Sequence, residues 1–213
     1  MPLSIDEIAA RLGQALTPDL DSESPYPGKF FTTKPRPAAV LITMIPKEEG
    51  WHLLFIRRTV SAHDRHSGQV AFPGGRCDPT DPDAETAARR EAHEEVGIKP
   101  GDVQILGQIR PMRTITNYRV TPIVGAIPWP YALVPQPEEV ARIFSIPLNW
   151  LADPLNRETR LHGLQFLGQD VPVIYFKEYD GELLWGASAR MTVLLLEALG
   201  LASSERRYIY KLS

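Results

Sequence analysis

The apolar and polar positions of the N-terminal part change from a helical period to a strand period. The capping box Ser4-Ile5-Asp6-Glu7 precedes apolar residues at helical spacing, so we expect a short amphipathic helix over about 5–16. Five prolines between 17 and 37 predict an extended connector. The nearly continuous apolar run 38–45 predicts a strand buried on both faces, and the strand expected over 51–58 forms a hairpin with it.

The rest of the chain combines further strands with two helices. The strands are expected over 69–72, 103–109, 120–127, 171–176 and 183–185, and the helices over about 82–96 and 188–200. Pro122 places its strand at a sheet edge or at a bulge, because proline cannot donate a ladder hydrogen bond. Helices that flank a strand-rich middle predict an α+β domain with a mixed sheet between helices. We expect this domain over 38–213, preceded by the helix and connector over 1–37.

Composition and charge exclude several classes of protein. The chain has 213 residues, of which 43% are hydrophobic and 23% charged, as is typical of one globular domain. A net charge of −3 argues against a general binder of nucleic acid or of a membrane surface. The single Cys77 excludes an internal disulfide and a cysteine-rich zinc site, and we expect it to be a small buried residue. Without a secretory signal or a long apolar run, the expected location is the cytoplasm.

A turn followed by a helix carries the candidate chemistry. The turn Phe72-Pro73-Gly74-Gly75 leads through a polar loop into the helix expected from about Pro82. Asp81 is the expected N-cap of that helix, and Gly97 is the glycine that ends it.

Three glutamates lie near the end of this helix. Because Glu91, Glu94 and Glu95 are three and four residues apart, they project from one side of the helix and repel one another. A solvated acidic face explains most such patterns, whereas a site for a hard divalent cation such as Mg²⁺ explains this one together with its neighbours. The turn at Gly74-Gly75 brings the backbone close to a ligand, and Arg90 can hold one carboxylate by a two-pronged hydrogen bond.

This stretch carries a family resemblance. The run Arg90-Glu91-Ala92-His93-Glu94-Glu95-Val96-Gly97-Ile98 resembles the second half of the Nudix box, Arg-Glu-aliphatic-x-Glu-Glu-x-Gly-aliphatic, and Gly75 resembles the glycine that opens the box. Ala92 is smaller than the usual aliphatic residue, Asp81 stands where the general box has its first glutamate, and the spacing from Gly75 to Arg90 is fifteen positions, one more than usual. The longer spacing, the Phe-Pro-Gly-Gly turn and the loop Asp78-Pro79-Thr80-Asp81 resemble the coenzyme A pyrophosphatase subfamily.

The resemblance covers about residues 38–195. The segment Leu53–Arg58 is similar to the start of the coenzyme A motif, which continues to Gly68 and the glycine turn. Phe55 replaces the threonine of that motif, and Arg57 lies eleven residues before Gly68, where the motif has nine, so that Arg65 is displaced from the motif's second arginine. Further segments resemble the subfamily at 121–125, 146–148 and 185–190.

The resemblance implies a Nudix-type α/β/α sandwich and a pyrophosphohydrolase that uses Mg²⁺ or Mn²⁺. It implies that Glu91, Glu95 and Glu94 hold the metal, that Glu94 accepts the proton of the attacking water, and that Glu91 and Arg90 complete the catalytic group. The implied substrate is coenzyme A or an acyl derivative, cleaved to 3′,5′-ADP and phosphopantetheine. The residues expected to bind this substrate are Gly74, Gly75, Arg57, Arg58, Arg65, Arg113 and Arg119.

Several alternatives remain open from the sequence. The substrate can be another nucleoside diphosphate derivative, such as ADP-ribose or a dinucleotide, and a Nudix-fold sensor without hydrolysis is a second class, although a sensor does not need all three glutamates. Glu138 and Glu139 fit a helix start better than a further carboxylate across the cleft. Each arginine taken alone also fits solvated surface charge. We expect neither nucleic acid nor a membrane as partner, and a homodimer is compatible with the sequence.

Overall fold

The helices and strands follow the predicted order, with differences in extent. The computed structural model describes residues 3–15, 31–60, 67–164 and 169–203, so Arg65 and the part of the connector over 16–30 lie outside it. The helices are α1 (Ile5–Ala15), α2 (Ala84–Val96), α3 (Leu148–Ala152) and α4 (Gly186–Ala198). The strands are β1 (Arg36–Lys47), β2 (Gly50–Arg58), β3 (Val70–Ala71), β4 (Gly74–Arg76), β5 (Gln104–Gln108), β6 (Met112–Arg113), β7 (Tyr118–Ala126), β8 (Val140–Pro147), β9 (Arg157–Leu164) and β10 (Gln169–Phe176).

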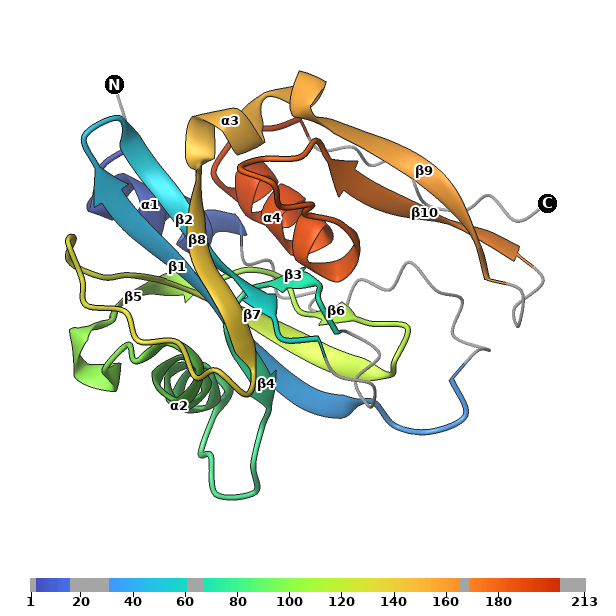
Figure 1. The fold of residues 1–213 in the computed structure, drawn as a ribbon, viewed down its shortest axis with the longest axis horizontal. Helices are drawn as coiled ribbons and strands as arrows, with labels where there is room; N and C mark the ends of the chain where they lie inside the picture. The colour runs from blue at the N-terminus through green and yellow to red at the C-terminus, as the bar shows by residue number, and fades with distance from the viewer. Residues whose placement is uncertain (1–2, 16–30, 61–66, 165–168, 204–213) are drawn as a thin grey trace.

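Strand β1 lies at the centre of a mixed eight-stranded sheet (Figure 1). It pairs parallel to β7 and antiparallel to both β2 and β4, and the hairpin predicted from the sequence is the β1–β2 pair. Strand β2 pairs in turn with β3 and β8, while β7 pairs with β5 and β6. The pairing of β4 with β1 holds the glycine turn against the central strand, where the sequence predicted only a turn.

Helices cover both faces of this sheet, which confirms the predicted α/β/α sandwich. Ala39, Leu41 and Ile45 of β1 pack with α2 on one face, whereas Ile42 and Met44 pack with α1 and α4 on the other. Because adjacent side chains of a strand point to opposite faces, one strand serves both cores. This double burial is the physical reason for the nearly continuous apolar run in the sequence.

Helix α1 packs against the core of the domain. The predicted capping box is confirmed, with Ser4 N donating to Glu7 Oε2 at 2.7 Å and Glu7 N donating to Ser4 Oγ at 3.2 Å. Ile8 and Leu12 are fully buried, and Arg11 donates to the carbonyl of Leu199 at the end of α4. The start of the chain therefore contributes to the same core, and a domain boundary at residue 38 stays a prediction.

Pro122 lies inside the sheet, so of the two predicted positions, an edge or a bulge, the edge is wrong. Strand β7 has β1 on one side and both β5 and β6 on the other. On that second side β6 pairs with Arg119 and Val120, and β5 pairs with 123–126, so Pro122 falls where the partner changes. A missing N–H is tolerated there, and the carbonyl of Pro122 still accepts the N–H of Ile109 at 3.1 Å.

The C-terminal part differs most from the prediction. The late strand β10 pairs with the unpredicted β9 in a separate two-stranded sheet, which extends beyond α4 in Figure 1. The expected strand over 183–185 is only a single bridge between Trp185 and Tyr175, whose rings stack at a centroid distance of 5.5 Å. In the part of the chain that the structure describes, no helix has both the length and the apolar character to cross a membrane.

Candidate active site

Helix α2 begins two residues later than the sequence predicted. Its N-cap is Asp83, whose side chain accepts the N–H of Thr86 at 2.7 Å, and the expectation of Asp81 as N-cap is wrong. The predicted end is confirmed, because Gly97 has a φ of 74° and donates to the carbonyl of His93 at 3.0 Å. Asp81 instead accepts the N–H of Asp78 at 2.8 Å, which closes the loop between β4 and α2.

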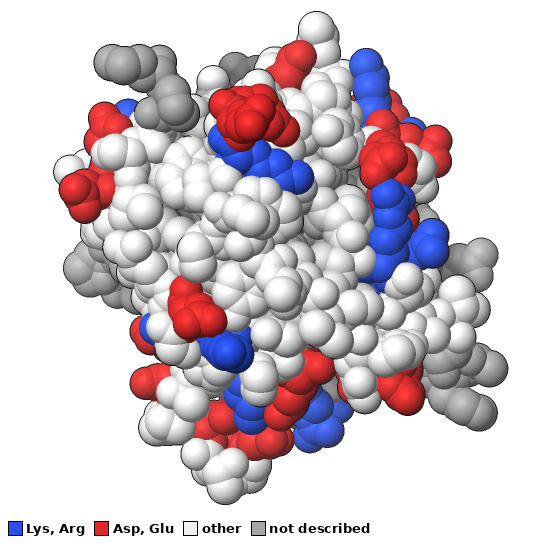
Figure 2. Space-filling model, turned by 60° about the vertical axis from the view of Figure 1, so that its left-hand side comes forward, with Lys and Arg blue, Asp and Glu red and all other residues white. Residues whose placement is uncertain are grey.

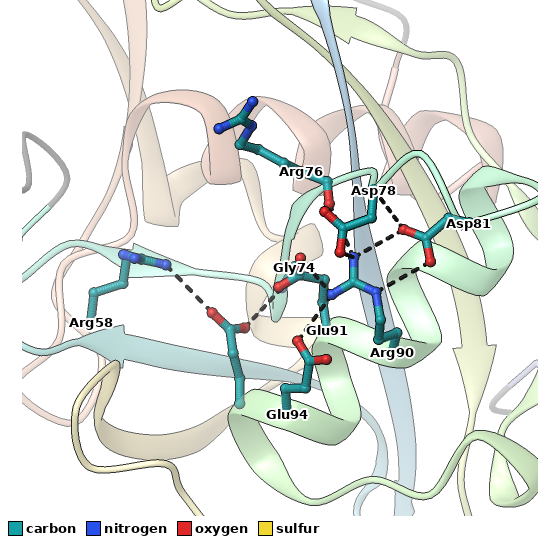
Figure 3. Close-up of polar contacts among 9 residues, drawn as sticks. Arg58, Gly74, Arg76, Asp78, Asp81, Arg90, Glu91 and Glu94 are labelled. Atoms are coloured by element: carbon teal, nitrogen blue, oxygen red, sulfur yellow. Dashed lines mark hydrogen bonds and ion pairs between the residues drawn. The ribbon is translucent and has the colours of Figure 1, made fainter.

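Arg90 ties this loop to the acidic side of α2 (Figure 3). Its Nε and Nη2 donate to the two oxygens of Asp81 at 3.2 and 3.0 Å, and Nη2 also donates to the carbonyl of Arg76 at 3.1 Å. Its Nη1 donates to Glu91 at 3.1 Å and to Glu94 at 3.0 Å. The bonded guanidinium lowers the pKa of Asp81, whose carboxylate in turn raises the pKa of Arg90. Arg90 is therefore a structural clamp for both ends of the site.

Glu95 is buried at the centre of the site, with a relative exposure of 3%. Its Oε2 accepts the N–H of Gly74 at 2.9 Å, and its Oε1 lies 3.4 Å from Nη1 of Arg58. The pKa of Glu95 is raised to about 7, mainly because burial takes water from the charged form. The charges of Glu91 and Glu139 act in the same direction, whereas the bond from Gly74 and the charge of Arg58 oppose the shift. A nearby cation would stabilise the charged form of this buried carboxylate.

Glu91 lies against the second glycine of the turn. A Cβ atom built on Gly75 would stand 2.6 Å from Glu91 Oε1, and burial raises the pKa of this glutamate as well. Position 75 therefore requires glycine because the Glu91 side chain lies so close to its Cα. Backbone conformation is not the reason, since the positive φ of the turn, 154°, is that of Gly74. A Cβ atom on Gly74 would stand 2.4 Å from the carbonyl oxygen of Ala39 in β1.

The two glycines should therefore respond differently to alanine. Gly75→Ala should lower kcat/KM by on the order of ten-fold or more, because Glu91 must move, with little change in the melting temperature. Gly74→Ala should instead destabilise the fold by about 1–3 kcal/mol, because it forces a strained φ and meets the backbone of β1. Steady-state kinetics and thermal unfolding of both variants separate the two effects. Unchanged kinetics in a well-folded Gly75→Ala variant would show that the approach to Glu91 serves only the fold.

The side chains of Glu91, Glu94 and Glu95 do not all point to the same part of the site. Glu94 is on the rim, with a side chain 57% exposed and bonded to Arg90, while Glu91 and Glu95 face the glycine turn. Among the described residues, no group of three acidic, histidine or cysteine side chains stands close enough together to hold a metal as arranged. The donor chemistry nevertheless fits a hard divalent cation, because two carboxylates with raised pKa adjoin a backbone turn.

A further carboxylate comes from the loop before β8. Glu139 raises the pKa of both Glu91 and Glu95, which places its charge near the site. The loop is bound to the end of α2 through the N–H of Gln136, which donates to the carbonyl of Glu95 at 2.9 Å. Residue 140 begins strand β8, so the preference for a helix start at Glu138 and Glu139 is wrong. The acidic pair itself was the signal in the sequence, and only the fold shows which strand it precedes.

Two of the predicted arginines follow each other on β2 and point in different directions. Arg58 lies on the side of α2, beside Glu95. Arg57 lies on the side of α4, with its Nη1 3.4 Å from Oε1 of the buried Glu182, which also contacts Arg142 at 2.9 Å. The alternation of side chains along a strand separates the two guanidinium groups, although they are neighbours in sequence.

The other predicted arginines are dispersed. Arg113 donates to Asn117 Oδ1 from Nε at 3.0 Å and stacks on Phe31 with 3.6 Å between Cζ and the ring centroid, so it braces the loop between β6 and β7. Arg119 is exposed on β7. On the face seen in Figure 2, basic and acidic side chains form several mixed groups, one of them at the lower end. His93 is exposed, and Cys77 is half-buried, with a pKa raised by burial.

The chain is similar in sequence to a family model and to several known proteins. The model of the NUDIX domain matches residues 34–167. An uncharacterized Nudix hydrolase NudL of Photorhabdus laumondii is 41% identical over 170 residues, which cover 78% of this chain and 86% of that protein. A NudL protein of Yersinia pestis is 37% identical over 161 residues, covering 75% and 78%. A crystal structure of an Ap4A hydrolase from C. elegans is 19% identical, with a TM-score of 0.46, covering 52% of this chain and 80% of that one.

Proposed function

The chain belongs to the Nudix hydrolase family, whose members act on pyrophosphate bonds of nucleoside diphosphate derivatives, and we propose that its substrate is coenzyme A or an acyl-coenzyme A. The products are then 3′,5′-ADP and the matching phosphopantetheine. The observation that supports hydrolysis most directly is the acidic side of α2, where buried Glu95 and half-buried Glu91 adjoin the turn at Gly74-Gly75.

Nudix hydrolases generally use Mg²⁺ or Mn²⁺, and the residues that would hold such an ion here are Glu91 and Glu95. When bound there, such an ion would neutralise diphosphate charge and lower the pKa of a water molecule. Glu139 adds negative charge beside these two carboxylates and is a further candidate ligand. Glu94 is exposed to solvent, and this access suits the role of proton acceptor that the sequence suggested, while its bond to Arg90 fixes the position of the carboxylate.

Arg90 orients the acidic groups. Its bonds to Asp81, Glu91 and Glu94 use both sides of the guanidinium, so the loop and the helix are set relative to each other before the substrate arrives.

The coenzyme A proposal rests on the sequence motif around the glycine turn and on the arginines near the site that could bind the 3′-phosphate. Coenzyme A carries a 3′-phosphate that ADP-ribose lacks, and that dianion needs a charged partner when it is taken from water. The candidates among the described residues are Arg58 and Arg119, because Arg57 lies on the opposite face of the sheet from Glu95 and Arg113 is already bound to Asn117. Arg65 is a further candidate outside the described residues.

Substrate choice is tested by kinetics on coenzyme A, dephospho-coenzyme A and ADP-ribose, measured side by side with Mg²⁺ and with Mn²⁺. We expect the loss of the 3′-phosphate to raise KM by on the order of ten-fold, as for the loss of a charged hydrogen bond of ~1.5–3 kcal/mol. Mass spectrometry of the products identifies the bond that breaks. If ADP-ribose has the highest kcat/KM, the substrate is another nucleoside diphosphate derivative. If none of a wider set of such compounds is hydrolysed, the non-catalytic sensor replaces the proposal.

A further inference from the structure

One carboxylate oxygen of Glu95, Oε1, has an unusual partner for a metal ligand, because this partner is itself positively charged. Oε2 is fixed by the N–H of Gly74 at 2.9 Å, whereas Oε1 meets Nη1 of Arg58 at 3.4 Å, which is beyond the usual range of a hydrogen bond between nitrogen and oxygen. Oε2 is therefore held in place by the backbone of the glycine turn. Oε1 is held only loosely by Arg58, so it can bind a metal ion instead.

A metal ion and Arg58 compete for this place. Glu95 is buried and needs a compensating positive charge, yet a guanidinium beside a divalent ion repels it. The side chain of Arg58 is 26% exposed, so its long stem gives the guanidinium a route toward solvent. Its position at the end of β2, across from the N-terminus of β8 at Val140, keeps it beside the site after it leaves Glu95.

We propose that Arg58 exchanges partners during the reaction cycle: it neutralises Glu95 in the metal-free protein, and once a divalent metal binds Glu95 it pairs with the diphosphate of the substrate. The inference rests on the proposed function, because it assumes that Glu91 and Glu95 hold the metal. Arg58 thereby links the arrival of the metal to the binding of the anion. Its planar guanidinium suits both partners, since carboxylate and phosphate each accept two parallel hydrogen bonds.

The chain provides a matched control in the next residue. Arg57 also faces a buried glutamate at 3.4 Å, but this is Glu182 on the opposite face of the sheet, where Arg142 is a second partner. Arg57→Gln therefore removes the same charge from the same strand without touching Glu95. Differences between the two variants report the position of the charge and not the net charge of the protein.

The first measurement is calorimetric titration of Mn²⁺ into metal-free protein at pH 8.5, without substrate. Arg58→Gln should tighten Mn²⁺ binding by on the order of ten-fold, because the competing charge is gone, whereas Arg57→Gln should change it by less than about two-fold. Thermal unfolding of each variant checks that the fold persists. Unchanged or weaker Mn²⁺ binding in a folded Arg58→Gln variant would overturn the competition.

The second measurement is the binding of ADP, the simplest nucleoside diphosphate, to each variant at saturating Mn²⁺. Arg58→Gln should weaken ADP binding by roughly ten-fold, and Arg58→Lys should recover part of the loss, because a charged hydrogen bond to phosphate is removed or only altered in shape. Equal ADP affinity in wild type and Arg58→Gln would refute the second half of the exchange. Because neither titration needs turnover, a failure of the coenzyme A proposal stays distinguishable from a failure of this one.

Discussion

Glu91→Gln and Glu95→Gln should each lower the turnover rate by on the order of 100-fold or more, a loss of ~2.7 kcal/mol in transition-state stabilisation. Each substitution keeps the size of the side chain but removes a charge that a divalent ion requires. Glu95→Gln also keeps an oxygen that can accept the N–H of Gly74, so the turn retains its contact with α2. Steady-state rates at saturating Mg²⁺ and Mn²⁺, together with thermal unfolding, are the measurements.

The same helix supplies the control for this prediction. Glu85 is bonded to Arg89 at 2.9 Å, close to the N-terminus of α2 and away from the glycine turn. Glu85→Gln should keep the turnover rate within about two-fold and cost at most ~1 kcal/mol of stability, as expected for a charge near the start of a helix. A rate above about a tenth of wild type in Glu91→Gln or Glu95→Gln would mean that this residue is not a direct ligand, since the loss is then below ~1.4 kcal/mol.

The metal-free protein should lose stability as the pH rises from about 4.5 to about 7. The pKa of Glu95 is raised to about 7 in the folded protein, mainly by burial, from a reference value of 4.5. Between these values the folded state binds more protons than the unfolded state, so the free energy of unfolding falls with pH, by ~3 kcal/mol in total. The stabilising proton is fully present below the unfolded pKa and is lost as the pH passes the folded one.

Chemical denaturation in the presence of a chelator at pH 5 and at pH 8 measures this loss. Other groups titrate in the same range; His52, for example, has a pKa lowered by burial, which changes stability in the opposite direction. The decisive quantity is therefore the difference between wild type and Glu95→Gln, in which the loss should largely vanish. Glu94→Gln, which alters an exposed side chain, should keep the wild-type dependence. Mn²⁺ at pH 8 should restore stability to wild type but not to Glu95→Gln.

The sequence was most informative where one local rule decides the structure. The capping box at Ser4 and the terminal glycine at Gly97 were predicted correctly, because both are hydrogen-bond patterns within a few residues. The hairpin of β1 and β2 was also predicted, since β1 is apolar on both faces and the turn between the two strands is short. The start of α2 was misplaced because Asp81 and Asp83 are both good N-caps. Asp81 is instead bound to Arg90, nine residues along the chain.

The pattern of apolar and polar residues could not predict contacts between segments that are distant in the sequence. Pro122 is tolerated because β7 changes partner at that residue, which depends on where β5 and β6 pair. The two-stranded sheet of β9 and β10 was half missed, because β9 carries many charged residues and too few apolar ones to stand out. The sequence predicted that the glycine turn brings the backbone close to a ligand, and only the structure shows that Gly75 makes room for Glu91.

By itself the sequence determined that this chain has a glycine turn, an acidic helix and a strand-rich sandwich, because spacing along a helix and alternation along a strand are local. Only the tertiary structure decided which glutamate is buried, since the burial of Glu95 depends on packing α2 against the glycine turn at β4 and the end of β2. It also separated Arg57 from Arg58, because the two faces of one strand meet different helices. The sequence gives the charge of each side chain, but the free energy of that charge depends on the water and the oppositely charged groups that surround it in the folded protein.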